Sequence, residues 1–118
     1  VIESSLRNVY GDPSRVTVVL VDRYFAMAVR EGNREALLAR FRGFGSRGDT
    51  LALRALRMPT LILWGERDRL IPPGDAARFA RDVAGSRVVM FPTLGHVPHE
   101  EDPAATIAPV LAFVRALP

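Results

Sequence analysis

The chain has 118 residues, 48% of them hydrophobic and 25% charged, so we expect one globular domain at most and not a disordered segment. The formal net charge is +3, and the 16 basic residues, all arginines, are scattered over helical patterns without the tight basic cluster that a nucleic-acid surface requires. The absence of cysteine excludes disulfides, and we expect a cytoplasmic location, with which this absence is compatible. No apolar run approaches the roughly 20 residues of a membrane span.

Residues 1–57 are expected to be mainly helical. They begin at Val1 without an initiator methionine or a signal-peptide pattern, so we expect the sequence to start inside a longer protein. Tyr10–Pro13 is a turn signal. Thr17 is expected to cap a helix that runs to about Glu31, although the run 16–21 also has strand propensity. Further along we expect a helix that starts after Gly32-Asn33, a loop at 43–48, and a short helix capped by Asp49 that ends near Ala55.

Met58-Pro59 marks a boundary, after which strands and helices alternate. Thr60–Trp64 is a short, continuous apolar run, which is typical of a strand buried on both faces of a parallel sheet. Arg87–Phe91 is expected to be a second strand. Between the strands we expect a loop at 65–71 and then a helix that Pro72 and Pro73 open and that ends near Ala84, with Gly85 as its stop. After the second strand we expect a loop at 92–101 and a last helix capped by Asp102. Pro109 should kink or split that last helix. This order indicates an α/β fold and the edge of a parallel sheet.

Two residues that can carry chemistry follow these two strands. Asp68 lies in the loop after the first strand, and His96 lies in the loop after the second. Either residue alone is more simply explained as a turn or loop residue. Together, at the same ends of neighbouring parallel strands, they can meet. A carboxylate beside an imidazole fixes the tautomer of the imidazole and prepares it for proton transfer, so we expect an Asp68 oxygen within about 3.5 Å of a His96 ring nitrogen, with His99 pointing elsewhere.

The segments around these residues resemble α/β-hydrolases. Pro59–Asp68, followed by Ile71-Pro72, resembles the strand and acid loop of that family. Gly95–Pro98, with Glu101 and Pro103, resembles its histidine loop and last helix, and the order of acid before histidine also fits. The resemblance implies that Asp68 is the acid and His96 the base of a catalytic triad.

The resemblance also implies how the chain is divided and what it does. Residues 58–118 would be the C-terminal part of the hydrolase core, and residues 1–57 a partial helical cap or lid segment. The family's nucleophile motif, Gly-x-Ser-x-Gly, is absent, since none of the five serines has glycines at that spacing. The expected function is therefore the C-terminal fragment of an esterase-like serine hydrolase that acts on an ester or similar bond of a small-molecule substrate. It would require the missing N-terminal part of the fold and would be inactive alone.

Other interpretations were weighed against this one. The acid and histidine loops look alike in epoxide hydrolases and dehalogenases, which use an aspartate nucleophile, and the chain could also be an inert, truncated binding module.

The Gly-x-Gly-x-x-Gly spacing at 43–48 follows a helix rather than a strand, so no cofactor is implied. His96, His99 and the acids at 100–102 do not have the spacing of a helical zinc motif, and a helix N-terminus normally collects acids, so no metal site is expected.

Overall fold

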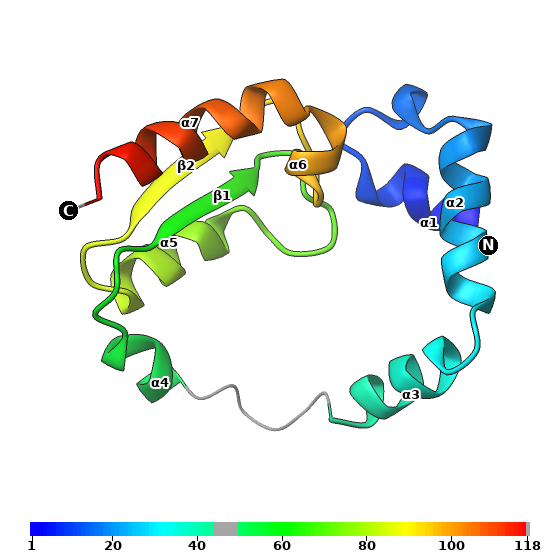
Figure 1. Cartoon of the computed structure of the whole chain (residues 1–118), viewed down its shortest axis with the longest axis horizontal. Coiled ribbons are helices and arrows are strands. Elements are labelled where there is room, and N and C mark those ends of the chain that lie inside the picture. Colours follow the sequence, from blue (N-terminus) through cyan, green and yellow to red (C-terminus); the bar gives the residue numbers. More distant parts are fainter. Residues whose placement is uncertain (44–49, 118) are drawn as a thin grey trace.

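The computed structural model describes residues 1–43 and 50–117. The expected cap Asp49 and almost all of the loop expected at 43–48 lie outside these residues. The elements in chain order are α1 (Ile2–Val9), η1 (Pro13–Arg15), α2 (Val18–Val29), α3 (Asn33–Gly43), α4 (Thr50–Ala55), β1 (Leu61–Gly65), α5 (Gly74–Asp82), β2 (Arg87–Phe91), α6 (Pro98–Glu101) and α7 (Pro103–Arg115) (Figure 1). The chain is therefore helical in its first half and α/β in its second, as the sequence predicts.

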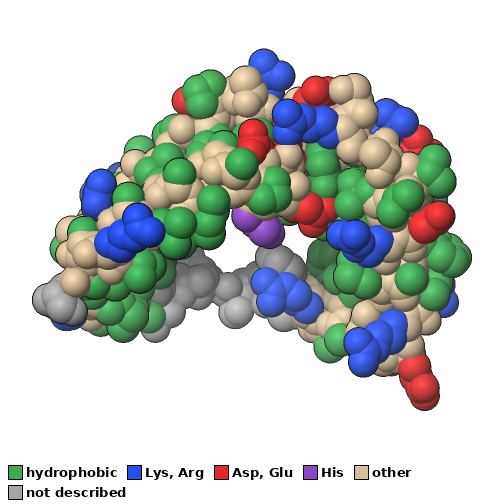
Figure 2. All heavy atoms as spheres, turned by 45° about the horizontal axis from the view of Figure 1, so that its top comes forward, with side chains coloured by type: hydrophobic (Ala, Val, Ile, Leu, Met, Phe, Trp, Pro, Cys, Tyr) green, Lys and Arg blue, Asp and Glu red, His purple; other side chains and the backbone are tan. Residues whose placement is uncertain are grey.

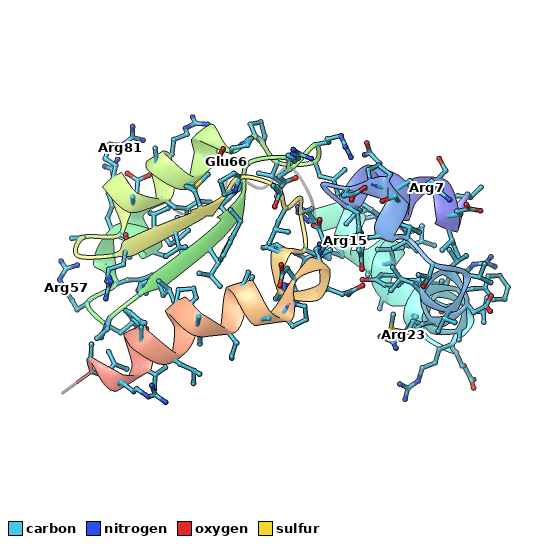
Figure 3. All side chains as sticks on the ribbon, turned by 90° about the horizontal axis from the view of Figure 1, so that it is seen from above. Arg7, Arg15, Arg23, Arg57, Glu66 and Arg81 are labelled. Atoms are coloured by element: carbon cyan, nitrogen blue, oxygen red, sulfur yellow. The ribbon has the colours of Figure 1, made fainter. Side chains whose placement is uncertain are left out.

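The strands β1 and β2 form a parallel pair, with Leu61 opposite Arg87 and Gly65 opposite Phe91. The connecting helix α5 lies on one face of the pair and α7 lies on the other (Figure 3). The expectation that the first strand is buried on both faces is wrong, because Leu61–Trp64 is only partly buried. The physical reason is that β1 pairs with β2 alone within the described ranges, so its other edge has no covering strand.

The helices α1 and α2 pack around a small core made by Leu6, Tyr10 and Val16. The capping of α2 is confirmed, because the Leu20 N–H donates a hydrogen bond of 3.2 Å to Thr17 Oγ1. The helix α1 was not expected, and no side chain caps its first turn. Its Leu6 is one of the few well-buried apolar side chains, which shows that packing rather than a capping signal stabilises this helix.

The helices of the second half depart from expectation in two places. The stretch 98–101, expected to be loop, forms the short helix α6. The helix α7 starts as predicted, with Asp102 accepting a hydrogen bond of 2.9 Å from the Ala105 N–H. It continues through Pro109 as one helix, so of the expected kink or split the split does not occur. A proline at this position removes the hydrogen bond to the Ala105 carbonyl, and the rest of the helix tolerates that loss.

Large hydrophobic side chains remain exposed on several helices, and Figure 2 shows such side chains over the face turned to the viewer. They include Val18 and Phe25 of α2, Leu37 and Phe41 of α3, and Ile107 and Val114 of α7. Exposed apolar surface of this extent is typical of sites where another molecule or segment packs. Among the helices of 1–43 and 50–117, none has the length and apolar character needed to cross a membrane.

Candidate active site

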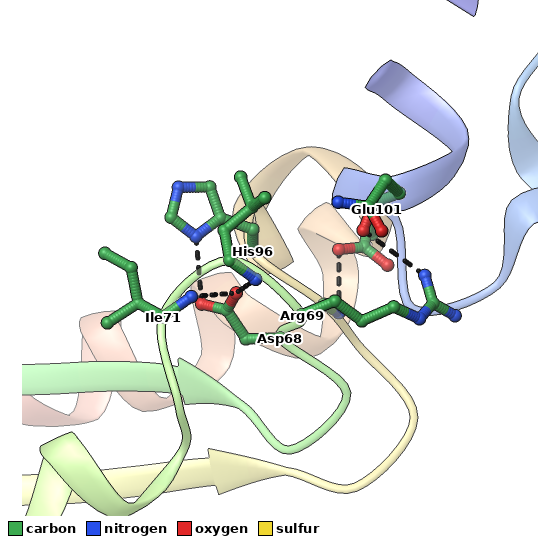
Figure 4. Close-up of polar contacts among 8 residues, drawn as sticks. Asp68, Arg69, Ile71, His96 and Glu101 are labelled. Atoms are coloured by element: carbon green, nitrogen blue, oxygen red, sulfur yellow. Dashed lines mark hydrogen bonds and ion pairs between the residues drawn. The ribbon is translucent and has the colours of Figure 1, made fainter. Parts of the chain in front are cut away.

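Asp68 stands at the carboxyl end of β1, in a tight turn that its own side chain stabilises. Its Oδ1 accepts hydrogen bonds from the N–H groups of Leu70 at 2.8 Å and Ile71 at 3.0 Å. Only 4% of the side chain is exposed. Because Oδ1 is engaged by the backbone, the carboxylate presents its second oxygen, Oδ2, to the histidine loop (Figure 4).

His96 stands at the carboxyl end of β2, and its Nδ1 lies 2.9 Å from Asp68 Oδ2. The predicted contact between the two side chains is therefore confirmed. An ionised carboxylate can only accept hydrogen bonds, so Nδ1 donates in this contact. In the neutral tautomer of the ring, the free electron pair is then on Nε2. His99 is exposed and lines a different hollow, beside Leu63 and Ile107, so it points elsewhere as expected.

Close contact between the two loops brings Asp68 and His96 together. The N–H of Glu66 donates to the Phe91 carbonyl and that of Arg67 donates to the Leu94 carbonyl, each at 2.9 Å. Gly65 makes this approach possible, because a Cβ atom there would lie 2.1 Å from the Gly95 carbonyl oxygen. The end of β1 thus requires glycine for steric reasons.

The charge on Asp68 is stabilised by its neighbours. Burial by itself would raise the pKa of this carboxyl, but the hydrogen bonds from Ile71, His96 and Leu70 outweigh burial and lower the pKa below its usual range. Asp68 is therefore ionised at neutral pH. An ionised partner keeps the His96 ring in the tautomer whose Nε2 can accept a proton.

A small hollow of about 150 Å³ adjoins the pair. It is lined by Leu63, Trp64, Gly65, Asp68, Ile71, His96 and Pro98. None of these is a serine, and Ser46 lies outside the described residues. The hollow therefore provides an acid, a base and apolar walls. No group of three or more His, Cys, Asp or Glu side chains in 1–43 and 50–117 is arranged to hold a metal ion.

Sequence reasoning missed the polar side chains that surround the pair. Glu100 and Glu101 were interpreted as acids at a helix start, and Glu101 also as part of the resemblance to the histidine loop, but no contact was predicted for either. Glu101 is buried at 6% exposure. It accepts hydrogen bonds from the backbone of Gly11 and Gly95. Arg69 donates to backbone carbonyls of the same N-terminal region, including Tyr10. No local pattern signals this contact, because Glu101 and Gly11 lie 90 residues apart in the sequence.

An acid loop and a histidine loop on adjacent parallel strands define the C-terminal part of an α/β-hydrolase. A model of the alpha/beta hydrolase family matches residues 4–109, which is most of the chain, and the chain belongs to that family.

Individual relatives agree with this assignment. The uncharacterized hydrolase YugF of Bacillus subtilis (strain 168) is 25% identical over 114 residues, which cover 97% of this chain and 42% of YugF. The structure of a serine hydrolase involved in carbazole degradation (CarC) superposes with a TM-score of 0.87 at 22% identity, over 98% of this chain and 46% of CarC. A meta-cleavage product hydrolase (CumD) gives 0.84 at 20% identity, over 98% of this chain and 45% of CumD. The chain thus spans less than half the length of the proteins it matches.

Proposed function

We propose that this chain is the C-terminal part of a hydrolase that cleaves an ester or similar bond of a small molecule with a Ser-His-Asp triad. Asp68 is the acid and His96 the base, and the serine belongs to a segment that precedes Val1. Residues 1–57 form a partial helical cap over the substrate, and residues 58–118 belong to the core. We also propose a cytoplasmic location, with which the lack of cysteine agrees.

The observation that carries this proposal is the contact of 2.9 Å between His96 Nδ1 and Asp68 Oδ2 beside an apolar hollow. In the proposed reaction, the serine hydroxyl attacks the carbonyl carbon of the substrate while His96 Nε2 takes its proton. His96 then donates that proton to the leaving group and activates a water molecule, which hydrolyses the acyl-enzyme. Asp68 holds the ring and stabilises the imidazolium throughout.

The test begins with the coding sequence upstream of Val1 and expression of the longer protein. We expect a strand, a Gly-x-Ser-x-Gly turn and a helix there, and reaction of that serine with a fluorophosphonate probe. His96→Ala should abolish labelling and lower the turnover of nitrophenyl esters by about 10⁴-fold or more. The matched control is His99→Ala, which should leave both unchanged. The 118-residue chain itself should not hydrolyse these esters above a histidine-containing control.

The other outcomes correspond to the alternatives. An aspartate at the turn, no phosphonate labelling and turnover of epoxides or haloalkanes would show the aspartate-nucleophile enzyme instead. A coding sequence that starts at Val1, together with no labelling, would show an inert chain. Normal ester turnover in His96→Ala would remove His96 from the mechanism.

A further inference from the structure

Glu101 is a buried carboxylate that the proposed reaction does not use. It ends helix α6 and is 6% exposed. Its Oε1 accepts a hydrogen bond of 2.8 Å from the Gly95 N–H, and its Oε2 accepts one of 2.7 Å from the Gly11 N–H. One carboxylate thus joins two backbone segments that are far apart in the sequence. Both hydrogen bonds are accepted by the same buried carboxylate, and hydrogen bonds to such a group are strong because little water competes for it.

The first of these bonds acts directly on the base. Gly95 precedes His96, whose own N–H donates to the Val9 carbonyl at 2.9 Å. The backbone on both sides of the 95–96 peptide is therefore held by the same two partners, Glu101 and residues 9–11. The two segments lie so close that there is no space for a side chain at position 95, because a Cβ atom on Gly95 would lie 2.4 Å from the Gly11 nitrogen.

The acid is fastened to the same place by the residue that follows it. Arg69, next to Asp68, donates from Nη1 to the Tyr10 carbonyl at 2.8 Å and from Nη2 to the Gly11 carbonyl at 3.3 Å. Figure 4 shows Arg69 and Glu101 beside the Asp68–His96 pair. The acid loop and the histidine loop are thus both anchored to residues 7–11, which we call the anchor segment.

We infer that Glu101 is a positioning residue, which holds the His96 backbone against the anchor segment so that the imidazole stays within hydrogen-bond distance of Asp68. The inference rests on the proposed function for the role of that pair. It goes beyond the triad, because it assigns to the N-terminal region a part in aligning the base.

The chemistry of the partners explains why position 101 requires a carboxylate. Both partners are backbone N–H groups, which can only donate, so two acceptor oxygens are needed. A glutamine amide has the same shape but offers only one oxygen, and its NH₂ group would face an N–H donor. The neighbouring Glu100 provides a matched control. Its carboxylate accepts from the hydroxyls of Tyr10 and Tyr24, and hydroxyls can reverse to accept from an amide.

The experiment is proton and nitrogen NMR of the His96 ring in the 118-residue chain, diluted until sedimentation shows a monomer. The sequence has only two histidines, so His99→Gln assigns the signals. In the unchanged chain we expect a low-field Nδ1–H signal protected by Asp68. In Glu101→Gln it should disappear or exchange with water about tenfold faster, the size of effect that loss of one buried hydrogen bond produces. In Glu100→Gln it should stay as in the unchanged chain.

The backbone amides of β1 and β2 distinguish positioning from a general loss of stability. Positioning predicts that their exchange rates stay unchanged in Glu101→Gln while the ring proton exchanges faster. A ring signal that is equally protected in Glu101→Gln and in the unchanged chain would overturn the inference, and so would equal acceleration of the ring and the strand amides.

A second variant decides the question if Glu101→Gln does not fold. Arg15 is exposed, and its Nη1 donates to the Glu101 carbonyl at 2.6 Å, between the N-terminal helices and α6 (Figure 3). Arg15→Met should loosen Glu101 without removing its carboxylate, and should accelerate exchange of the ring proton to a smaller extent. An unaltered ring signal in Arg15→Met would then refute the inference. Because no hydrolysis is measured, these results are independent of the failure or success of the proposed function.

Discussion

The hydroxyl of Tyr24, in the second helix, donates a hydrogen bond of 2.9 Å to the Glu100 carboxylate, 76 positions further along the chain. The hydroxyl of Tyr10 donates to the other oxygen of the same carboxylate. Burial, reinforced by the hydrogen bond to Glu100 and by its negative charge, raises the pKa of Tyr24 to about 12. The same causes also raise the pKa of Tyr10. Both phenols therefore stay protonated in the folded chain at pH values where they would ionise in the unfolded chain.

This protonation predicts a loss of stability in alkali. A raised folded-state pKa contributes stability that is fully present below the unfolded pKa, about 10, and that is lost as pH rises through the folded value. The free energy of unfolding should therefore fall above pH 10. In Tyr24→Phe this fall should be shallower, because one of the two phenols is gone, while stability at pH 7 should drop by about 1 kcal/mol. Urea titrations between pH 7 and 11 measure both effects, and identical pH slopes would contradict the prediction.

The lowered pKa of Asp68 predicts that stability is lost in acid instead of in alkali. Its lowered pKa contributes stability that is present above the unfolded value, about 3.9, and that is lost as pH falls through the lower folded value. The unfolding free energy of the unchanged chain should therefore fall more steeply below pH 4 than that of Asp68→Asn. Asp75→Asn, which removes a surface ion pair with Arg78, serves as the control and should change little. If the unfolding free energy falls equally steeply below pH 4 in all three chains, Asp68 is not a charged partner of His96.

Gly65→Ala tests the close approach of the two loops. A methyl group there would collide with the carbonyls of Leu94 and Gly95, both of which are backbone, so we expect destabilisation of about 1–3 kcal/mol or more. Gly74→Ala is the matched control, because it opens helix α5 and faces empty space. It should be neutral or stabilise the chain by about 0.5–1 kcal/mol. Thermal melting of both variants gives the comparison, and equal melting temperatures would show that the loops can separate without cost.

The isolated chain should be marginally stable and should associate. Within the described ranges β1 pairs with β2 alone, and exposed apolar side chains lie on α2, α3 and α7. Such surfaces promote association. Sedimentation should show a mass that increases with concentration, and Ile107→Lys, at a side chain that is 50% exposed, should reduce it without lowering the melting temperature. A monomer that melts sharply at all concentrations would show that the chain closes its own core.

Much of the second half of the fold could be predicted, because its signals are local. Thr60–Trp64 and Arg87–Phe91 are mainly apolar runs flanked by proline, glycine or serine, and both form strands at or within one residue of the predicted bounds. Asp102 followed by Pro103 is a local capping signal, and α7 starts there. The helix α1 could not be predicted in this way, because it depends on the packing of Leu6 against Tyr10 and Val16.

The same distinction applies to the site. Asp68 and His96 each follow a strand, and parallel strands end at the same edge of a sheet. The positions of the two residues after their strands therefore predict that they meet. The bond between Glu101 and Gly11 depends on how the N-terminal helices dock against α6, and no local pattern encodes that docking. The catalytic roles of Asp68 and His96 stay predictions.

The bridge from Glu101 to Gly11 also bears on the order in which the chain folds. It joins positions 90 residues apart, and such distant contacts form only after the entropy of closing the intervening loop has been overcome. The helices and the β1–α5–β2 unit need much shorter loops and should form earlier. Since Glu101 is synthesised 90 residues after Gly11, we expect a growing chain to have α1 and α2 in place while its acid–base pair is not yet aligned.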